Sequence, residues 1–332
     1  METYNSNQEG NEYQSRIPVD KVAAMMDKVK DTIAEIVVGQ DLMIEQLMTA
    51  LLADGHVLLE GVPGVAKTLT AKTMAKMVEA DFSRIQFTPD LMPSDVIGTN
   101  IFNPQKANFD FKKGPIFGNI VLIDEINRSP AKTQAALFEV MEERQITTDG
   151  VTYPMEAPFM VIATQNPIEH EGTYRLPEAQ LDRFLFKINV QYPSLEEEVL
   201  MLTHHHEQKG AVSLDSLKPV ISKADIDYCR SIVKQVLVES KLLQYITQIV
   251  ADTRNNPSLF LGASPRAAIA ILNASKALAI LKGRDFVTPD DIKAIVPAVL
   301  RHRIALTPEK EMEGLSPDDV LKEIVNRVEV PR

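Results

Sequence analysis

Residues 58–72, LLEGVPGVAKTLTAK, decide the fold, because they join the end of a predicted strand to a glycine-containing loop and the start of a helix. The loop is similar to the phosphate-binding pattern G-x-x-x-x-G-K-[ST], in which the second glycine immediately precedes the lysine. Ala66 occupies the position of that glycine. Alanine adds one methyl group and keeps its backbone N–H, so it interferes only where the backbone requires a positive φ.

A loop of this kind would bind the phosphates of a nucleotide. Its backbone N–H groups converge on phosphate oxygens, and the helix that follows adds the positive end of its dipole. Lys67 is expected to contact the β- and γ-phosphates, and Thr68 to offer its hydroxyl group to Mg²⁺. A tight turn without a ligand is the alternative that the loop alone leaves open. The residues predicted to bind the nucleotide here are Gly61, Val62, Pro63, Gly64, Val65, Ala66, Lys67, Thr68 and Leu69.

Two adjacent acidic residues favour a nucleotide site over a simple turn. Residues 119–129, NIVLIDEINRS, contain an apolar run that predicts a buried strand ending at Asp124 and Glu125. Asp124 would hold Mg²⁺ together with Thr68, and Glu125 would orient and polarise the attacking water, as a Mg²⁺-dependent nucleoside triphosphatase requires. A pair of surface acids that merely ends a strand is the alternative.

Three further polar residues are candidates for the same chemistry. Asn166 follows another apolar run, in APFMVIATQNP, where its amide could position the attacking water. Arg183 directly precedes a predicted strand. Arg266 lies in the first turn of a predicted helix, where the helix dipole disfavours a cation, so we expect an anion nearby. Each arginine alone could equally be an ordinary salt-bridge residue.

The order of apolar runs and helical patterns indicates an α/β fold. Short apolar strands alternate with helices over residues 18–192, which predicts a parallel sheet covered by helices on both faces. Two inserts, 98–114 and 145–155, have the patterns of hairpins. Helical patterns alone follow over residues 193–332, which predicts an all-α second domain. The polar residues 1–17 are expected to form a disordered tail.

Composition excludes several classes of protein. The chain of 332 residues carries a formal net charge of −11, which argues against a generally basic surface for nucleic acid. It contains no apolar run that approaches the ~20 residues of a membrane helix. Cys229 is its single cysteine, so neither an internal disulfide nor a cysteine metal site is possible, and we expect a cytoplasmic protein.

The motifs occur in the order typical of AAA+ ATPases. The sequence resembles the MoxR family over roughly residues 20–330, most specifically in the segments GVPGVAKT, LIDEINR, ATQNP and LPEAQLDRF. The resemblance implies a nucleotide-binding α/β domain and a helical lid, with ATP and Mg²⁺ bound between them. Alanine before the lysine is a familiar variant in that family. The resemblance further implies that Val38, Gly39 and Gln40 lie against adenine.

The same resemblance suggests roles for the polar candidates and for the protein as a whole. Asn166 would act as sensor 1, Arg266 as sensor 2, and Arg183 as an arginine finger that reaches a neighbouring subunit's ATP. Arg175 stands where the family more often has proline, which leaves the finger open between Arg183 and Arg175. The family forms homo-oligomers, here expected to be hexameric rings, that remodel partner proteins, often ones with von Willebrand A domains. An AAA+ motor on DNA and a non-hydrolysing nucleotide switch are the alternatives.

Overall fold

The computed structural model describes residues 15–105, 107–167, 174, 176–207, 214 and 217–331. Residues 1–14 of the predicted tail lie outside this part of the chain. The prediction of disorder is wrong for residues 15–17, because the backbone N–H of Arg16 donates to Asp285 Oδ2 at 2.9 Å and Ile17 packs against the core.

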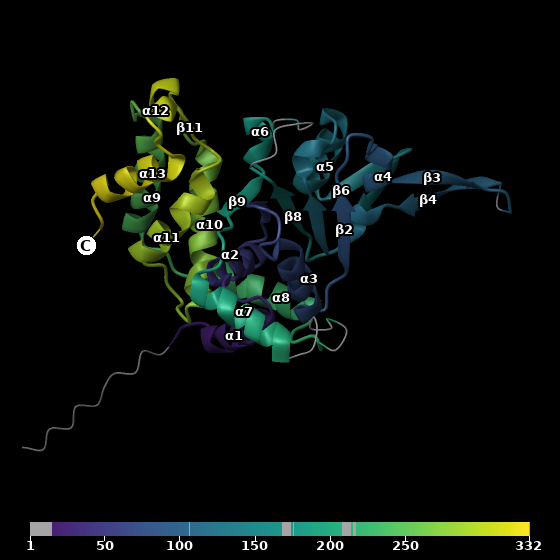
Figure 1. Ribbon diagram of the computed structural model, residues 1–332, viewed down its shortest axis with the longest axis horizontal. Coiled ribbons are helices and arrows are strands. Elements are labelled where there is room, and N and C mark those ends of the chain that lie inside the picture. The colour runs from purple at the N-terminus through teal and green to yellow at the C-terminus, as the bar shows by residue number, and fades with distance from the viewer. Residues whose placement is uncertain are drawn as a thin grey trace, which may run out of the picture.

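A five-stranded parallel sheet forms the centre of the first part of the chain (Figure 1). Its strand order is β2-β5-β8-β1-β9, and each neighbouring pair is parallel. Each strand corresponds to an apolar run of the sequence, so the predicted parallel sheet is confirmed. The strands are β1 (His56–Glu60), β2 (Phe82–Gln86), β5 (Ile120–Asp124), β8 (Met160–Gln165) and β9 (Phe184–Asn189).

Helices cover both faces of this sheet, as the continuous apolar strands predict. Alternate strand residues enter two separate hydrophobic clusters: Val57 and Leu59 belong to one, and Leu58 to the other. The first cluster includes residues of α1 (Val19–Ile36), α2 (Asp41–Leu52) and α3 (Lys67–Met77). The second includes residues of α4 (Pro93–Ile97), α5 (Ala131–Glu143) and the 3-10 helices η1 (Pro115–Phe117) and η2 (Ile126–Arg128).

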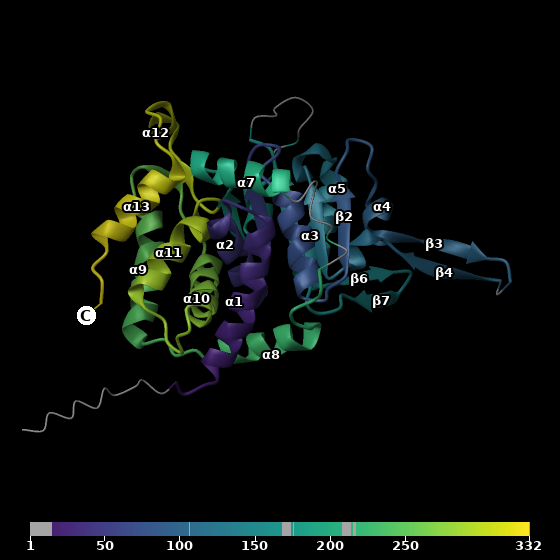
Figure 2. The same ribbon diagram turned by 60° about the horizontal axis from the view of Figure 1, so that its bottom comes forward.

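Both predicted hairpins are present, and they contact each other. The longer one, β3 (Gly98–Asn103) and β4 (Asn108–Lys113), extends away from the body of the molecule (Figures 1 and 2). The shorter one consists of β6 (Gln145–Thr148) and β7 (Val151–Pro154). Phe111 stacks on Tyr153 with a centroid distance of 4.6 Å, which fastens the base of the longer hairpin to the shorter one.

The second part of the chain is helical, as predicted, with one small exception. Leu259–Leu261 (β10) pairs antiparallel with Ala305–Leu306 (β11), a ribbon too short to give an alternating sequence pattern. The helices are α7 (Leu195–Glu207), α8 (Lys223–Val233), α9 (Ser240–Arg254), α10 (Pro265–Leu281), α11 (Pro289–Leu300), α12 (Pro308–Met312) and α13 (Pro317–Arg327), while α6 (Glu178–Leu181) precedes β9. Within the described residues, no helix is both long and apolar enough to cross a membrane.

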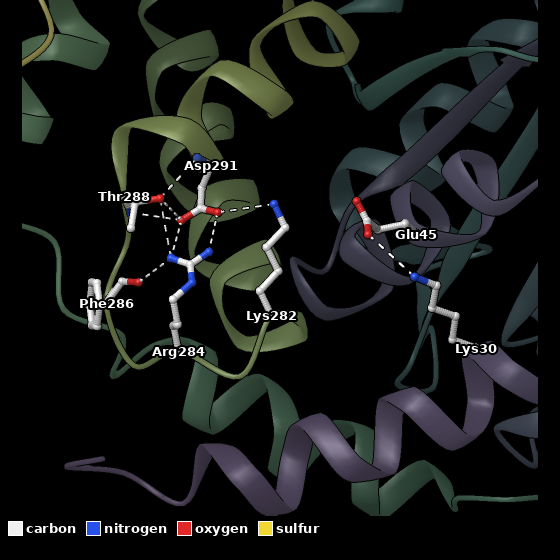
Figure 3. A network of polar contacts seen from close by, with 7 residues as sticks. All are labelled: Lys30, Glu45, Lys282, Arg284, Phe286, Thr288 and Asp291. Atoms are coloured by element: carbon white, nitrogen blue, oxygen red, sulfur yellow. Dashed lines mark hydrogen bonds and ion pairs between the residues drawn. The ribbon is translucent and has the colours of Figure 1, made fainter. Parts of the chain in front are cut away.

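The two parts of the chain share a hydrophobic core. Helix α10 packs against α1 and α2, and α11 packs against β9. A buried carboxylate fixes the turn between α10 and α11 (Figure 3): Arg284 donates to both oxygens of Asp291, at 2.6 and 2.7 Å. Although burial opposes it, hydrogen bonds from Arg284 and Thr288 hold the pKa of Asp291 below its usual value. The lid is therefore attached to the sheet domain through α10 and α11, and Asp291 holds the turn between these two helices.

Candidate functional site

The carboxyl ends of the central strands open onto a cavity of about 420 Å³. Ligands of open parallel sheets bind at this edge, where loops leave the strands. The cavity brings together the principal residues that the sequence predicted, namely Lys67 and Thr68 of the loop, Asp124 and Glu125 after β5, and Asn166 after β8. Its other lining residues are Pro63, Gly64, Ala66, Leu69, Arg84, Gln86 and Thr164.

Two glycines give the loop its shape for different reasons. A Cβ atom at Gly61 would lie 2.8 Å from the carbonyl oxygen of Val190, so only glycine fits where the loop passes the backbone after β9. Gly64 has open space around it but adopts a φ of 90°, which other residues rarely tolerate. Val65 is buried and anchors the loop in the core.

Ala66 adopts a left-handed backbone conformation, with φ 59° and ψ 16°. The position therefore meets the one condition under which alanine was expected to interfere. Left-handed backbone costs a non-glycine residue about 1–2 kcal/mol, so the loop is strained here. The backbone N–H and the hydroxyl of Thr70 both donate to the Ala66 carbonyl at 2.9 Å and hold this first turn of α3. The alanine is accommodated at a cost.

The Lys67 side chain folds back to the start of the loop that precedes it. Its Nζ donates to the carbonyl oxygen of Gly61 at 2.6 Å. Burial lowers the pKa of Lys67 below its usual value, and the negative charges of Asp124, Glu125 and Glu60 partly oppose this. A phosphate oxygen would be a stronger acceptor for this ammonium group than a carbonyl, because charge-assisted hydrogen bonds are the stronger ones.

Asp124 is held by residues from the two strands beside β5. The Arg84 Nε atom on β2 donates to Asp124 Oδ2 at 2.6 Å, and the Thr164 hydroxyl on β8 donates to Oδ1 at 3.3 Å. Thr164 Oγ1 also accepts from the backbone N–H of Glu125 at 3.1 Å, so one hydroxyl group links the two acidic residues.

The Glu125 carboxylate is held in place by two side chains. Its Oε2 accepts from Gln86 Nε2 at 2.9 Å and lies 3.0 Å from Arg128 Nε. The residue itself has a φ of 57°, the kind of strained backbone that gathers at functional sites. The acid that would activate water is thus already oriented by protein contacts.

The sequence did not single out Arg84, Gln86 or Thr164. In β2, Arg84 and Gln86 are polar residues at alternate positions, which gives them one face of the strand. They reach the site only because β2 pairs with β5, with Gln86 opposite Asp124. That pairing cannot be read from local pattern.

The oxygen ligands in the cavity fit a magnesium ion. Mg²⁺ is usually held by one or two carboxylates together with substrate phosphates. The Asp124 carboxylate and the Thr68 hydroxyl are such ligands, and both line the cavity beside Lys67. Asp124 could coordinate the ion with both carboxylate oxygens only if its ion pair with Arg84 broke.

Arg183 and Arg266 lie elsewhere, around a second cavity or at its edge. Arg183 lines a cavity of about 190 Å³ with residues of α5, and its Nη1 donates to the carbonyl of Phe138 at 2.8 Å. Arg266 pairs with Glu142 at 3.1 Å. The anion expected near Arg266 is therefore a carboxylate of α5, and the structure does not bring this arginine to the phosphate loop of its own chain. Arg175 lies outside the described residues.

Val38, Gly39 and Gln40 lie beside the segment that leads into α7 and do not line the main cavity. Gln40 Nε2 donates to the carbonyl of Gln191 at 3.1 Å. A Cβ at Gly39, whose φ is 74°, would come within 3.0 Å of Pro193 and of the Glu197 carboxyl group. Contact of residues 38–40 with adenine stays a prediction.

Comparisons with known proteins agree with this architecture. The profile of the "ATPase family associated with various cellular activities (AAA)" matches residues 56–186, and that of the AAA lid domain matches residues 251–324. The chain is 48% identical to the uncharacterised protein YeaC of Bacillus subtilis, with 92% of this chain and 95% of YeaC covered. It is 46% identical to the chaperone MoxR1 of Mycobacterium tuberculosis, with 90% and 81% covered.

A solved structure extends the similarity to three dimensions. It is a crystal structure of a protein from Cytophaga hutchinsonii whose assignment as an ATPase is provisional. The two chains are 43% identical and superpose with a TM-score of 0.87, over 95% of this chain and 97% of the other. The sheet domain and the lid therefore keep their arrangement between the two proteins.

Proposed function

The chain belongs to the MoxR family of AAA+ ATPases, and on that basis we propose that it binds Mg²⁺·ATP at the main cavity and hydrolyses it to ADP and phosphate. The observation that carries the proposal is the convergence of Lys67, Thr68, Asp124, Glu125 and Asn166 on one cavity from three separate segments of the chain. A surface turn with two unrelated acids would not gather all five.

The proposed hydrolysis assigns one task to each residue. Lys67 leaves the Gly61 carbonyl and binds the β- and γ-phosphates, while loop N–H groups bind the remaining oxygens. Glu125 accepts a hydrogen bond from the attacking water and polarises it, and the Asn166 amide fixes the position of that water. Magnesium, held by Thr68 and Asp124, would neutralise charge on the phosphates. Catalysis of phosphoryl transfer rests mainly on such positioning and charge stabilisation.

Among the described residues that line the cavity of a single chain, none is an unpaired arginine that could bind the γ-phosphate. Among its described lining residues, Arg84 is the one arginine, and it is paired with Asp124. Arg183 and Arg266 lie together near α5 instead. We therefore propose a head-to-tail homo-oligomer, a hexameric ring, in which Arg183 and Arg266 of one chain complete the site of the next. Arginine fingers of this kind raise turnover by about 10³–10⁵.

The work that hydrolysis drives is proposed to be remodelling of partner proteins in the cytoplasm, among them proteins with von Willebrand A domains. The support is the name of one relative, a chaperone that is 46% identical over 90% of this chain. The net charge of −11 agrees with protein rather than nucleic-acid partners.

Two variants test the assigned roles. Lys67→Ala should weaken ATP binding strongly, because Lys67 contacts phosphate in the ground state. Glu125→Gln should retain binding and lose turnover, because Glu125 acts on the water. Binding of a fluorescent ATP analogue and release of phosphate, measured for both proteins, separate the two effects. An equal loss of ATP binding in both variants would overturn the assignment. In a separate pull-down, the Glu125→Gln protein should retain its partner proteins.

A further inference from the structure

A further cavity, of about 430 Å³, lies at the joint between the lid and the sheet domain. This joint cavity is lined by the end of α2 and the residues that follow it, by α8 and by α10, three elements that pack against one another (Figure 1). It is about as large as the nucleotide cavity, and none of the residues assigned to nucleotide binding or hydrolysis lines it. The proposed ATPase therefore gives the joint cavity no role.

The joint cavity lies at the opposite edge of the sheet from the nucleotide cavity. Asp54, which lines it, comes two residues before β1 begins at His56, whereas the phosphate loop follows the end of β1 at Glu60. At ~3.3 Å per residue, the strand separates the two cavities by roughly 15 Å. A small ligand in the joint cavity would therefore not touch the nucleotide.

Cationic side chains outnumber carboxylates in the joint cavity. Its lining contains Arg230, Lys234 and Lys276 but a single carboxylate, that of Asp54. This carboxylate is already shared, because Arg230 Nη1 and Arg144 Nη1 lie 2.8 and 2.9 Å from its Oδ1 atom. The chain as a whole has a net charge of −11, so the local excess of positive charge runs against the overall balance.

The two lysines supply hydrogen-bond donors that the protein does not use. Lys276 Nζ makes one long hydrogen bond, of 3.4 Å, to the carbonyl oxygen of Lys234. In the part of the chain that the structure describes, neither ammonium group has a carboxylate partner. Each ammonium group has three N–H donors, and the Asn273 amide in the lining adds two more. The joint cavity is thus rich in donors and poor in acceptors.

Arg230 is the fixed part of this cluster. Its Nε and Nη2 atoms both donate to the carbonyl oxygen of Leu51, at 3.0 and 2.8 Å, which holds the guanidinium group at the end of α2. Burial lowers the pKa of Arg230 and the charge of Arg144 adds to this, whereas Asp54 and Asp227 oppose it. An anion in the joint cavity would act in the same direction as these two carboxylates and stabilise the charged guanidinium.

We propose that the joint cavity binds the phosphate group of a small molecule, with Arg230, Lys234 and Lys276 as its cationic partners. Phosphate suits these donors, because its oxygens accept several charge-assisted hydrogen bonds at once. Leu52 and Val233 line part of the cavity, whose volume is typical of small-molecule sites, so an organic group fits beside the phosphate. The bound phosphate would join α2 to α8 and α10 and so hold the lid to the sheet domain. Binding at this site does not depend on ATP hydrolysis.

Calorimetric titrations with inorganic phosphate and with ribose 5-phosphate test the proposal. They are made at a constant ionic strength and on the Lys67→Ala protein, because the phosphate loop of the unmodified chain would also bind phosphate. Saturable binding with a stoichiometry of one per chain is expected. Tighter binding of ribose 5-phosphate would identify an organic phosphate as the source of the group, and equal affinities would identify free phosphate.

Glutamine substitutions remove charge from the joint cavity and leave its fixed arginine in place. Lys234→Gln and Lys276→Gln, each added to Lys67→Ala, should weaken phosphate binding about tenfold, because each removes a charge-assisted hydrogen bond. Together they should abolish measurable binding. The matched control is Lys322→Gln, which changes an exposed lysine of α13 and should leave the affinity unchanged.

Thermal unfolding supplies a second readout. Phosphate should raise the midpoint of unfolding of the Lys67→Ala protein, because a ligand that binds only the folded state stabilises it, and should not raise that of the variant that also lacks both cavity lysines. The midpoints without phosphate should agree among the variants, which shows that they fold.

Either of two results would overturn the phosphate site. One is the absence of saturable binding to Lys67→Ala, because phosphate then binds the nucleotide cavity alone, and the proposed ATPase function stands. The other is a loss of affinity in Lys322→Gln as large as that in the cavity variants. Saturable, lysine-dependent binding by a chain whose unmodified form never hydrolyses ATP would keep the phosphate site and reject the proposed ATPase function alone.

Discussion

Arg183 and Arg266 reach the same helix from two distant parts of the chain: Arg183 donates to the Phe138 carbonyl at 2.8 Å, and Arg266 pairs with Glu142 at 3.1 Å. Phe138 and Glu142 are one helical turn apart on α5. The adjoining Asp182 is fixed by the buried Arg303, whose Nε donates to it at 2.6 Å. Both arginines are therefore held at one edge of the sheet domain, outside the cavity that we propose they complete in a neighbouring chain.

This arrangement predicts that the arginines act between subunits. Arg183→Ala should abolish hydrolysis and spare ATP binding, because the finger acts on charge that develops in the transition state. Mixing it with Lys67→Ala protein should restore part of the activity, since mixed interfaces can combine an intact loop with an intact finger. The measurement is phosphate release from each variant and from the mixture.

Arg266→Ala and Arg175→Ala, tested in parallel, decide between the candidate arginines. The mixture of Arg183→Ala and Lys67→Ala chains could stay inactive although light scattering shows that they co-assemble. If Arg175→Ala alone also stops turnover, the finger is Arg175. Full activity of all three alanine variants would reject the mechanism in trans.

The backbone at Ala66 predicts a small gain from glycine. Ala66→Gly removes left-handed strain of about 1–2 kcal/mol but adds the entropy of an unfolded glycine, about 0.5–1 kcal/mol. The free energy of unfolding should rise by up to ~1.5 kcal/mol, and ATP affinity should change by less than about tenfold. Urea denaturation and ATP titration measure the two quantities.

Ala71→Gly is the matched control for that substitution. Ala71 is buried inside the same helix, α3, and glycine there should lower the free energy of unfolding by about 1 kcal/mol or more. A loss of stability at Ala66 similar to that at Ala71 would contradict the strain argument, and a gain in affinity of several orders of magnitude would mean that the native loop is impaired.

The pair Arg84–Asp124 predicts a competition with magnesium. Arg84→Gln should lower the Mg²⁺ concentration required for half-maximal hydrolysis, because Asp124 no longer has to leave a 2.6 Å ion pair. A partly exposed ion pair is worth ~1 kcal/mol or less, so the shift should be up to about fivefold. Arg327→Gln breaks an exposed pair with Asp252 instead and should leave the requirement unchanged. A higher requirement in Arg84→Gln would show that Arg84 supports the metal site.

Buried histidine predicts a loss of stability in mild acid. Burial, together with the charge of Arg144, lowers the pKa of His56 from 6.5 to about 4. The unfolded chain therefore takes up the proton first, so stability is complete above pH 6.5 and falls as the pH drops toward 4. The shift corresponds to about 3 kcal/mol. His302, whose pKa burial also lowers, adds a loss of the same sign.

Unfolding of the unmodified chain and of His56→Gln at a series of pH values checks this. Glutamine can still accept from the Val161 N–H and donate to the Met141 carbonyl, the two bonds that His56 makes, but it does not titrate. The variant should show a shallower loss between pH 6.5 and 4. Identical slopes would exclude His56 as the cause.

The sequence by itself determined the parts of this protein that depend on neighbours in the chain. Strand β5 ends at Asp124 because an apolar run ends there, and Lys67 begins a helix because a glycine-containing loop precedes it. The hairpin turn at Asp149 and Gly150 has positive φ at both residues, as its sequence requires. Since parallel strands end at one edge, even the meeting of Lys67, Asp124 and Asn166 could be predicted.

Only the tertiary structure decided which strands lie side by side and which surfaces stay uncovered. Arg84 and Gln86 line the site because β2 pairs with β5. Arg266 lies outside the site because the packing of α10 places it against Glu142. The apolar pattern of α7 predicted a helix but not that its apolar residues would face outward. Strand order, lid position and burial depend on contacts between residues far apart in the chain, and local periodicity contains no information about those contacts.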